Sequence, residues 1–231
     1  MPDFNKRATG LEIMDDFSLG ADEIDPLLGG LEKVNQYLGG YKVVFSALKE
    51  VSVKNNFHIS DWGCGGGDVL RAIEKKAEKQ NLHLQFTGID ATPAAVNFAN
   101  RKNTSPQIRF ILADVLSEEV STLKFDIVLS TLFTHHFEDE AWILLIKKMI
   151  NCSRRAVIID DLHRHWFAYY AIKIITRIVT RSRLARYDGP LSVLRGFKRK
   201  ELESLLQQAG IKNYNIKWMW AFRWRIILYK S

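Results

Sequence analysis

The strongest constraint on the fold of this chain is a glycine-rich run, His58-Ile59-Ser60-Asp61-Trp62-Gly63-Cys64-Gly65-Gly66-Gly67-Asp68. The four glycines follow an apolar, strand-like segment and precede a helical one. Glycine permits a sharp backbone turn, and it lets a ligand approach where a Cβ atom would collide. The first N–H groups of the following helix have no partners within the helix. The run therefore predicts a loop that binds a nucleotide cofactor between a strand and a helix.

The acid before the glycines helps to distinguish a dinucleotide from a cofactor that carries an ammonium group. Asp61 stands at the predicted strand end, where its carboxylate would repel the pyrophosphate of a dinucleotide. The same carboxylate could accept a hydrogen bond from an ammonium group. A dehydrogenase therefore remains an alternative, with Asp61 as its main difficulty.

The pattern Asp61-x-Gly63-x-Gly65-x-Gly67 resembles motif I of the class I S-adenosylmethionine (SAM) methyltransferases. The resemblance continues downstream, because Asp90 and Asp114 each end a strand-like segment, as do the family's acids for the ribose hydroxyls and the adenine amino group. We expect Cys64 to be a small buried filler, because no cation flanks it to make it a nucleophile. The resemblance implies nine cofactor-binding residues: Asp61, Gly63, Cys64, Gly65, Asp90, Ala91, Asp114, Val115 and Thr131.

Alternating strand-like and helical segments predict an α/β fold, a Rossmann-like doubly wound sheet of seven mainly parallel strands with an antiparallel terminal strand. Residues 1–54 are expected to form an N-terminal helical cap before a SAM-binding domain over 55–231, with a helical lid insert at about 163–197. The strands are expected near 57–62, 83–90, 108–114, 125–131, 155–161, 214–220 and 224–229. The main helices are expected near 67–80, 93–102, 138–151 and 198–210.

The insert carries much of the formal net charge of +7. Its predicted helix over 166–179 is apolar and aromatic, and Lys173, Arg177 and Arg181 recur every fourth residue. Four interpretations stay open: a lid over an apolar acceptor, a basic amphipathic surface that rests on an anionic membrane, a nucleic-acid grip, or a packed helix with one solvated stripe.

The cap and the insert also resemble those of bacterial small-molecule methyltransferases. The resemblance rests on three segments, Glu12-Ile13-Met14-Asp15-Asp16, Asn35-x-x-Leu38-Gly39-Gly40 and Asp188-Gly189-Pro190-x-Ser192-Val193-Leu194-Arg195-Gly196-Phe197. It implies the cofactor and the reaction type but no particular acceptor.

Methyl transfer to a hydroxyl requires a base, and histidine suits that role near neutral pH. His135 and His136 follow the fourth strand, and His163 follows Asp160-Asp161 after the fifth, where Asp161 could orient it. A pure packing role for these histidines is the alternative. No metal is expected, because neighbouring residues on a strand point to opposite faces and these acids cannot all converge with His163.

The residues directly after the fourth strand bear on the acceptor. Ser130-Thr131-Leu132-Phe133 stands where nitrogen methyltransferases carry an Asn/Asp-Pro-Pro-aromatic run. We expect a small aromatic or lipophilic acceptor methylated on oxygen, with carbon as the second choice, and no sequence-specific nucleic acid. An RNA methyltransferase that uses the basic insert and a non-catalytic SAM-fold partner subunit are the rival classes. Without a signal peptide or a spanning segment, the protein is expected to be cytoplasmic, with peripheral membrane contact through the insert as an option.

Overall fold

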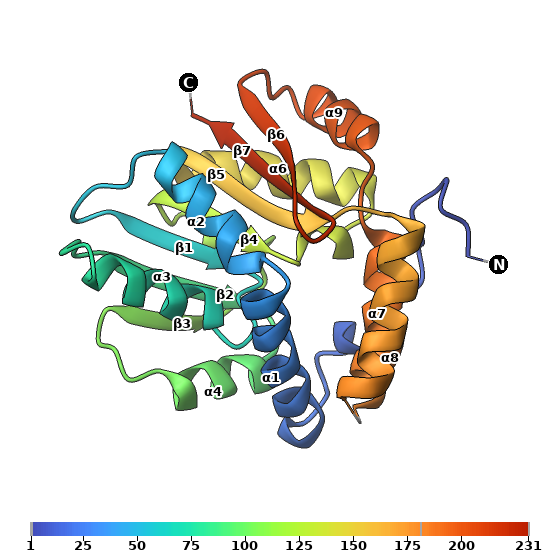
Figure 1. Ribbon diagram of the computed structural model, residues 1–231. Helices are drawn as coiled ribbons and strands as arrows, with labels where there is room; N and C mark the ends of the chain where they lie inside the picture. Colours follow the sequence, from blue (N-terminus) through green and yellow to red (C-terminus); the bar gives the residue numbers. More distant parts are fainter. Residues whose placement is uncertain (1, 181, 231) are drawn as a thin grey trace.

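The computed structural model describes residues 2–180 and 182–230 and contains a seven-stranded sheet flanked by helices (Figure 1). The strand order is β3-β2-β1-β4-β5-β7-β6, in which β7 runs antiparallel to both of its neighbours and the remaining pairs are parallel. This confirms the predicted sheet. The strands are β1 (His58–Trp62), β2 (Gln85–Asp90), β3 (Ile108–Leu112), β4 (Phe125–Thr131), β5 (Ser153–Leu162), β6 (Tyr214–Met219) and β7 (Arg223–Tyr229).

Both faces of the sheet are covered because successive strand side chains point to opposite sides. Ala156 and Ile158 of β5 belong to a core shared with helices α2 (Gly40–Glu50) and α3 (Asp68–Glu78). Val157 and Ile159 belong to the other core, formed with α6 (Asp139–Cys152) and α9 (Arg199–Gln208). The short helix α5 (Glu118–Ser121) joins this second layer.

The N-terminal region contains a 3-10 turn, η1 (Ile13–Asp15), followed by α1 (Ala21–Tyr37) and α2. Helix α1 packs on α4 (Pro93–Lys102), with Leu28 and Phe98 in their shared apolar cluster. Helix α2 instead packs on β5 and β7. The predicted boundary at residue 54 therefore falls after a helix that shares the core of the sheet.

The helical insert follows β5 as predicted and consists of α7 (Trp166–Val179) and α8 (Arg183–Arg195), which pack side by side (Figure 1). The two helices approach closely at Gly189, where an added Cβ would lie 3.3 Å from Ile172 and Thr176. Arg181, the third member of the predicted basic stripe, lies outside the described residues. Among the helices described, none combines the length and the apolar character needed to cross a bilayer.

The direction of winding reverses between β1 and β4, which lie side by side at the centre of the sheet. Open α/β sheets bind their ligands beyond the carboxyl ends of the strands at such a point. Asp61 and Asp90 stand at that edge, and so does the 3-10 turn η2 (Thr134–His136) that follows β4. We therefore expect a ligand site at this edge of the sheet.

Candidate cofactor and catalytic site

A cavity of about 340 Å³ lies at the carboxyl edge of the parallel strands. All nine residues predicted to bind the cofactor line it: Asp61, Gly63, Cys64, Gly65, Asp90, Ala91, Asp114, Val115 and Thr131. The loops after β1, β2, β3 and β4 supply these residues, so four separate segments meet at one place. Their role in binding stays a prediction, but the structure brings them together as that prediction requires.

The glycine loop depends on backbone conformations that other residues rarely adopt. Gly63 has φ +69° and Gly67 has φ +71°, both in the left-handed region. A Cβ at Gly63 would lie 2.2 Å from the ring of Phe133, which packs over the loop. The loop is fixed to the next strand end because the amide of Gly65 donates to the Asp90 carboxylate over 2.8 Å.

Three acids, Asp61, Asp68 and Asp90, line the inner end of the cavity, and Asp61 and Asp68 are buried. Burial raises the pKa of Asp61 well above its usual value, and the neighbouring charges of Asp68 and Asp90 raise it further. Asp68 accepts hydrogen bonds from Asn35 (3.1 Å) and Tyr41 (3.0 Å), but no donor among the described residues pairs with Oδ1 of Asp61. An unpartnered buried oxygen in such surroundings fits a cationic ligand group and disfavours a phosphate.

Cys64 lies in the same loop and is buried. Burial and the nearby carboxylates of Asp90 and Asp61 raise the pKa of its thiol well above the usual value. The thiol therefore stays protonated, which agrees with a filler role and opposes a nucleophilic one.

His135 is buried beside the cavity and is held by Asp161 of β5. Its Nδ1 lies 2.6 Å from Oδ1 of Asp161, whose other oxygen accepts from the Thr134 hydroxyl and from the amide of His135. Burial alone would lower the pKa of His135, but the charges of Asp161 and Glu12 raise it to about 9. His135 is therefore an imidazolium at neutral pH.

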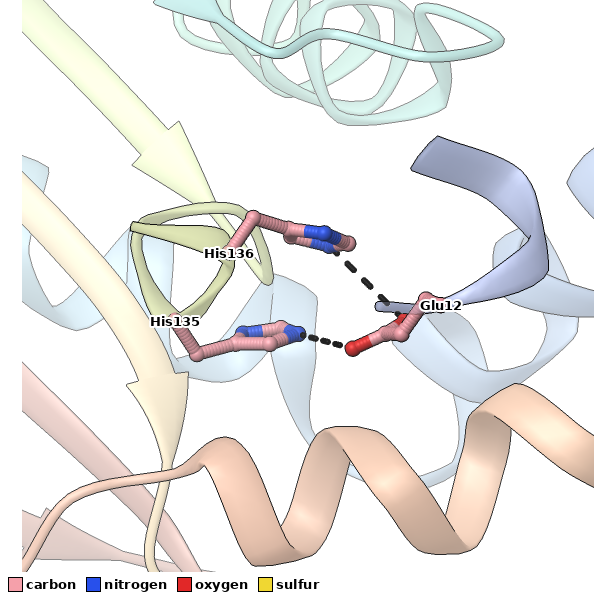
Figure 2. Close-up of side chains that lie close together, drawn as sticks. All are labelled: Glu12, His135 and His136. Atoms are coloured by element: carbon pink, nitrogen blue, oxygen red, sulfur yellow. Dashed lines mark ion pairs between the residues drawn. The ribbon is translucent and has the colours of Figure 1, made fainter. Parts of the chain in front are cut away.

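The N-terminal turn brings Glu12 between the two histidines (Figure 2). Oε1 of Glu12 lies 3.5 Å from Nε2 of His135, and Oε2 lies 3.9 Å from Nε2 of His136. Nδ1 of His136 lies 2.6 Å from Oδ1 of Asp15. His136 borders the cavity, whereas His135 does not. The two neighbouring histidines thus occupy different environments.

Glu12, His135 and His136 offer donor atoms within 4.8 Å of one another, so their fit to a metal ion can be tested. The two imidazole rings stand 4.5 Å apart with planes only 30° from parallel. Nitrogen lone pairs in nearly parallel rings run side by side and do not converge on one ion. The arrangement fits a carboxylate shared by two histidines better than a metal, and a metal-free site stays our prediction.

His163 lies outside the cavity lining. Its Nδ1 accepts a hydrogen bond from Nε1 of Trp218 over 3.2 Å, and its ring packs against Phe222 and Trp224. Burial, together with the nearby cations, lowers the pKa of His163 to about 4. Asp161, which the sequence suggested as its partner, pairs with His135 instead. The structure therefore separates His163 from the other two candidates.

The cover of the cavity comes from the N-terminal segment before α1, which we call the N-terminal lid (residues 9–17). Leu11, Met14, Asp15 and Phe17 line the cavity, and no described residue of α7 or α8 does so. The insert that the sequence suggested as a lid acts instead as the support of this segment.

Helix α8 holds the lid through two charged residues. The Asp188 carboxylate accepts from the amides of Ile13 (2.7 Å) and Met14 (3.1 Å). Arg195 is buried and donates to the carbonyls of Gly10, His135 and His136. Sequence reasoning missed the roles of Glu12, Asp15, Asp188 and Arg195. The only available signal was that their two segments occur together in the methyltransferases that the chain resembles.

The sheet order and the glycine loop after its first strand define a Rossmann-like fold. Residues 59–155 match the family model described as a methyltransferase domain. A search of the sequences of curated proteins gives no match.

Several solved structures share the fold at low sequence identity. Magnesium protoporphyrin IX methyltransferase from Synechocystis PCC 6803, solved with SAM and with S-adenosylhomocysteine (SAH), is 16% identical in the SAH complex, with 84% of each chain covered and a TM-score of 0.57. The plantazolicin methyltransferase BpumL is 18% identical over 88% of this chain and 89% of its own, with a TM-score of 0.63. An O-methyltransferase family protein from Burkholderia thailandensis is 12% identical over 97% of this chain and 65% of its own, with a TM-score of 0.70.

Proposed function

We propose that the cavity binds SAM and that the protein transfers its methyl group to an oxygen of a small apolar or aromatic acceptor. The observation that carries the proposal is the position of His136. Its ring borders the cavity that the glycine loop and the buried acids form, and its Nδ1 is held by Asp15. One cavity thus contains both the acids expected to bind the cofactor and a candidate base.

The acids support one orientation of the cofactor. The unpartnered oxygen of Asp61 would accept from the ammonium group, and ionisation of Asp61 would become favourable beside that cation. Asp90, anchored by the amides of Gly65 and Thr92, would hold the ribose hydroxyls. Asp114 at the exposed rim would meet the adenine amino group. Bound in this way, SAM supplies an electrophilic methyl group on a positively charged sulfur.

His136 is the residue that can remove a proton from an acceptor hydroxyl. When its Nδ1–H donates to Asp15, the lone pair on Nε2 is free to accept. The O–H proton moves to Nε2, the oxygen forms its bond to the methyl carbon, and the C–S electron pair stays on sulfur. His135 is less suited to this step, since its pKa of about 9 keeps it protonated and it does not border the cavity.

The rest of the cavity wall supports an apolar acceptor. Its large apolar side chains come mainly from the N-terminal lid, from α1 and from the loop after β4: Leu11, Met14, Phe17, Leu28, Leu31, Leu132, Phe133 and Phe137. Aromatic and aliphatic walls favour flat, lipophilic molecules such as phenols, enols or quinols. A reactive ring carbon of the same molecules is the competing acceptor atom.

Calorimetric titration with SAM and SAH tests the cofactor assignment, with NADH as the control ligand. We expect binding of SAM and SAH and none of NADH. Replacement of Asp90 by Ala should weaken SAM binding by about 2 kcal/mol, because two charge-assisted hydrogen bonds to the ribose are lost. The exposed Asp22→Ala variant serves as the matched control and should bind as the parent does. Equal affinity in the Asp90→Ala variant, or no SAM binding by the parent, would contradict the proposal.

A labelled methyl group then identifies the acceptor atom. The protein is incubated with methyl-labelled SAM and with panels of phenols, quinols and electron-rich rings, and the products are analysed by mass spectrometry and NMR. A methoxy product supports oxygen transfer. A new carbon–methyl bond would retain the methyltransferase assignment and replace the oxygen acceptor by carbon.

A further inference from the structure

We propose that the exposed face of α7 is a docking surface for an anionic lipid bilayer. The proposal concerns a surface separate from the cavity, and it holds or fails independently of the acceptor. The bilayer-facing surface is defined by Trp166, Phe167, Tyr170, Ile174 and Ile178 of α7 together with Trp218 of β6.

The apolar side chains of α7 gather on one side of the helix. At 3.6 residues per turn, the five α7 members span roughly 120° of the helix circumference. All five are exposed, with Trp166 at 57%, Ile174 at 58% and Ile178 at 79% of full exposure. The opposite side packs on α8. A helix that packs on one side and exposes large apolar residues on the other leaves a face without a partner.

The β6–β7 hairpin extends this surface at the start of α7. The ring of Phe222 packs against Phe167 at 5.8 Å and against Trp218 at 5.9 Å between centroids. Trp218 is 44% exposed. Tryptophan and tyrosine are the side chains that favour the level of the lipid headgroups, because one part of each ring is apolar and another is polar.

Basic side chains border the apolar stripe. At 3.6 residues per turn, Arg177 lies between Trp166 and Tyr170 on the helix surface and Lys173 lies beside Trp166, while Arg183 and Arg186 belong to the first turn of α8. In the part of the chain that the structure describes, no acidic side chain forms an ion pair with any of these four residues. The only acid between His163 and Lys200 is Asp188, which is buried and holds the N-terminal lid.

This combination favours a bilayer over other partners. A second copy docked face to face would bring the same basic residues against each other without an acid between them. Nucleic acid would pair with the charges but would leave the isoleucines without an apolar partner. An anionic bilayer meets both needs, because its headgroups attract the cations while its acyl boundary accepts the apolar stripe. With 14 residues, α7 is too short to span and would lie in the plane of the surface.

Cosedimentation with vesicles tests the proposal. We expect the full chain to bind vesicles of phosphatidylcholine mixed with phosphatidylglycerol, and to bind pure phosphatidylcholine vesicles much less. Ile178→Glu should lower the partition coefficient at least about tenfold, since an apolar contact is replaced by a charge of the wrong sign. Arg177→Ala should lower it about fivefold. Leu144→Glu, at an exposed apolar position on α6, is the matched control and should bind as the parent does.

Titration with SAM and circular dichroism confirm that each variant is folded. The proposal is overturned if the parent does not bind anionic vesicles, if neutral and anionic vesicles bind equally, or if Ile178→Glu binds as tightly as Leu144→Glu. Sedimentation velocity and an RNA-binding assay test whether a second copy of the chain or a nucleic acid occupies the surface instead. A dimer that dissociates in Ile178→Glu would assign the face to a second copy, and a single-stranded RNA that binds more tightly than the vesicles would assign it to nucleic acid.

Discussion

At the scale of single residues, two adjacent histidines carry different chemistry because different carboxylates hold them. Asp161 and Glu12 surround His135 and keep its pKa at about 9, so it acts as a fixed positive charge. His136 meets Asp15 through Nδ1 and presents its ring to the cavity. A carboxylate that orients an imidazole in this way sets which nitrogen is available to the acceptor.

Replacement of His136 by Ala should therefore lower the rate of methyl transfer about 100-fold or more, because the proton acceptor is lost, while SAM affinity stays unchanged. Asp15→Asn should cause a smaller loss, since the base remains but its orientation weakens. Single-turnover rates with a hydroxyl acceptor measure the effect, and His83→Ala at an exposed position is the control. A parental rate in the His136→Ala variant would show that His136 is not the base and has only a packing role.

At the scale of elements, the N-terminal lid depends on α8. The Asp188 carboxylate satisfies the amides of Ile13 and Met14, which lie in the 3-10 turn that carries Asp15. Arg195 ties the same helix to the carbonyls of Gly10 and His136. The insert after β5 thereby positions side chains that lie 175 residues earlier in the sequence.

Asp188→Ala should loosen the lid without unfolding the sheet. Two hydrogen bonds to a charged group are lost, so amide exchange at Ile13 and Met14 should accelerate at least about tenfold. The KM for the acceptor should rise as well, because the lid forms one wall of its cavity. Hydrogen–deuterium exchange measures the first effect. Asp16→Ala, whose carboxylate makes only the local contacts to Ser18, is the control and should leave this exchange unchanged.

The elements that the sequence predicted well are those with local signals. Apolar segments that alternate with helical ones marked the strands, and the glycine loop with its following acids marked the cofactor edge. The lid and the Asp161–His135 pair escaped prediction because they depend on contacts between distant segments. Glu12 and Asp15 are polar residues in a short turn that has no apolar period, so nothing local indicated that they would be drawn into the site.

At the scale of the whole molecule, a series of buried polar contacts joins β7, the strand next to the edge strand β6, to the glycine loop. Arg223 of β7 pairs with Asp160 of β5 over 2.6 Å and donates to Asn35 of α1. Asn35 in turn donates to Asp68, the first residue after the glycines. Hydrogen bonds between buried groups are strong because water does not compete for them, so this series holds α1 and the sheet in place relative to the cavity.

The three acids at the inner end of the cavity predict how cofactor binding responds to pH. Burial raises the pKa values of Asp61, Asp68 and Asp90 above the ordinary 3.8. These three groups therefore bind more protons in the free folded protein than in the unfolded chain between about pH 4 and their raised pKa values, and their contribution to stability falls as the pH rises through that window. A cation beside Asp61 would lower the raised pKa of its carboxyl group, because the cation favours the ionised carboxylate.

Binding of SAM should consequently release on the order of one proton near the raised pKa of Asp61, and SAM affinity should increase with pH across the same window. Calorimetry in buffers of different ionisation enthalpy counts the released proton. Adenosine, which lacks the ammonium and sulfonium groups, should release none, and Asp61→Asn should abolish most of the release with SAM while raising the thermal stability of the free protein. Proton uptake with SAM, or the same release in Asp61→Asn, would show that Asp61 does not meet the cation.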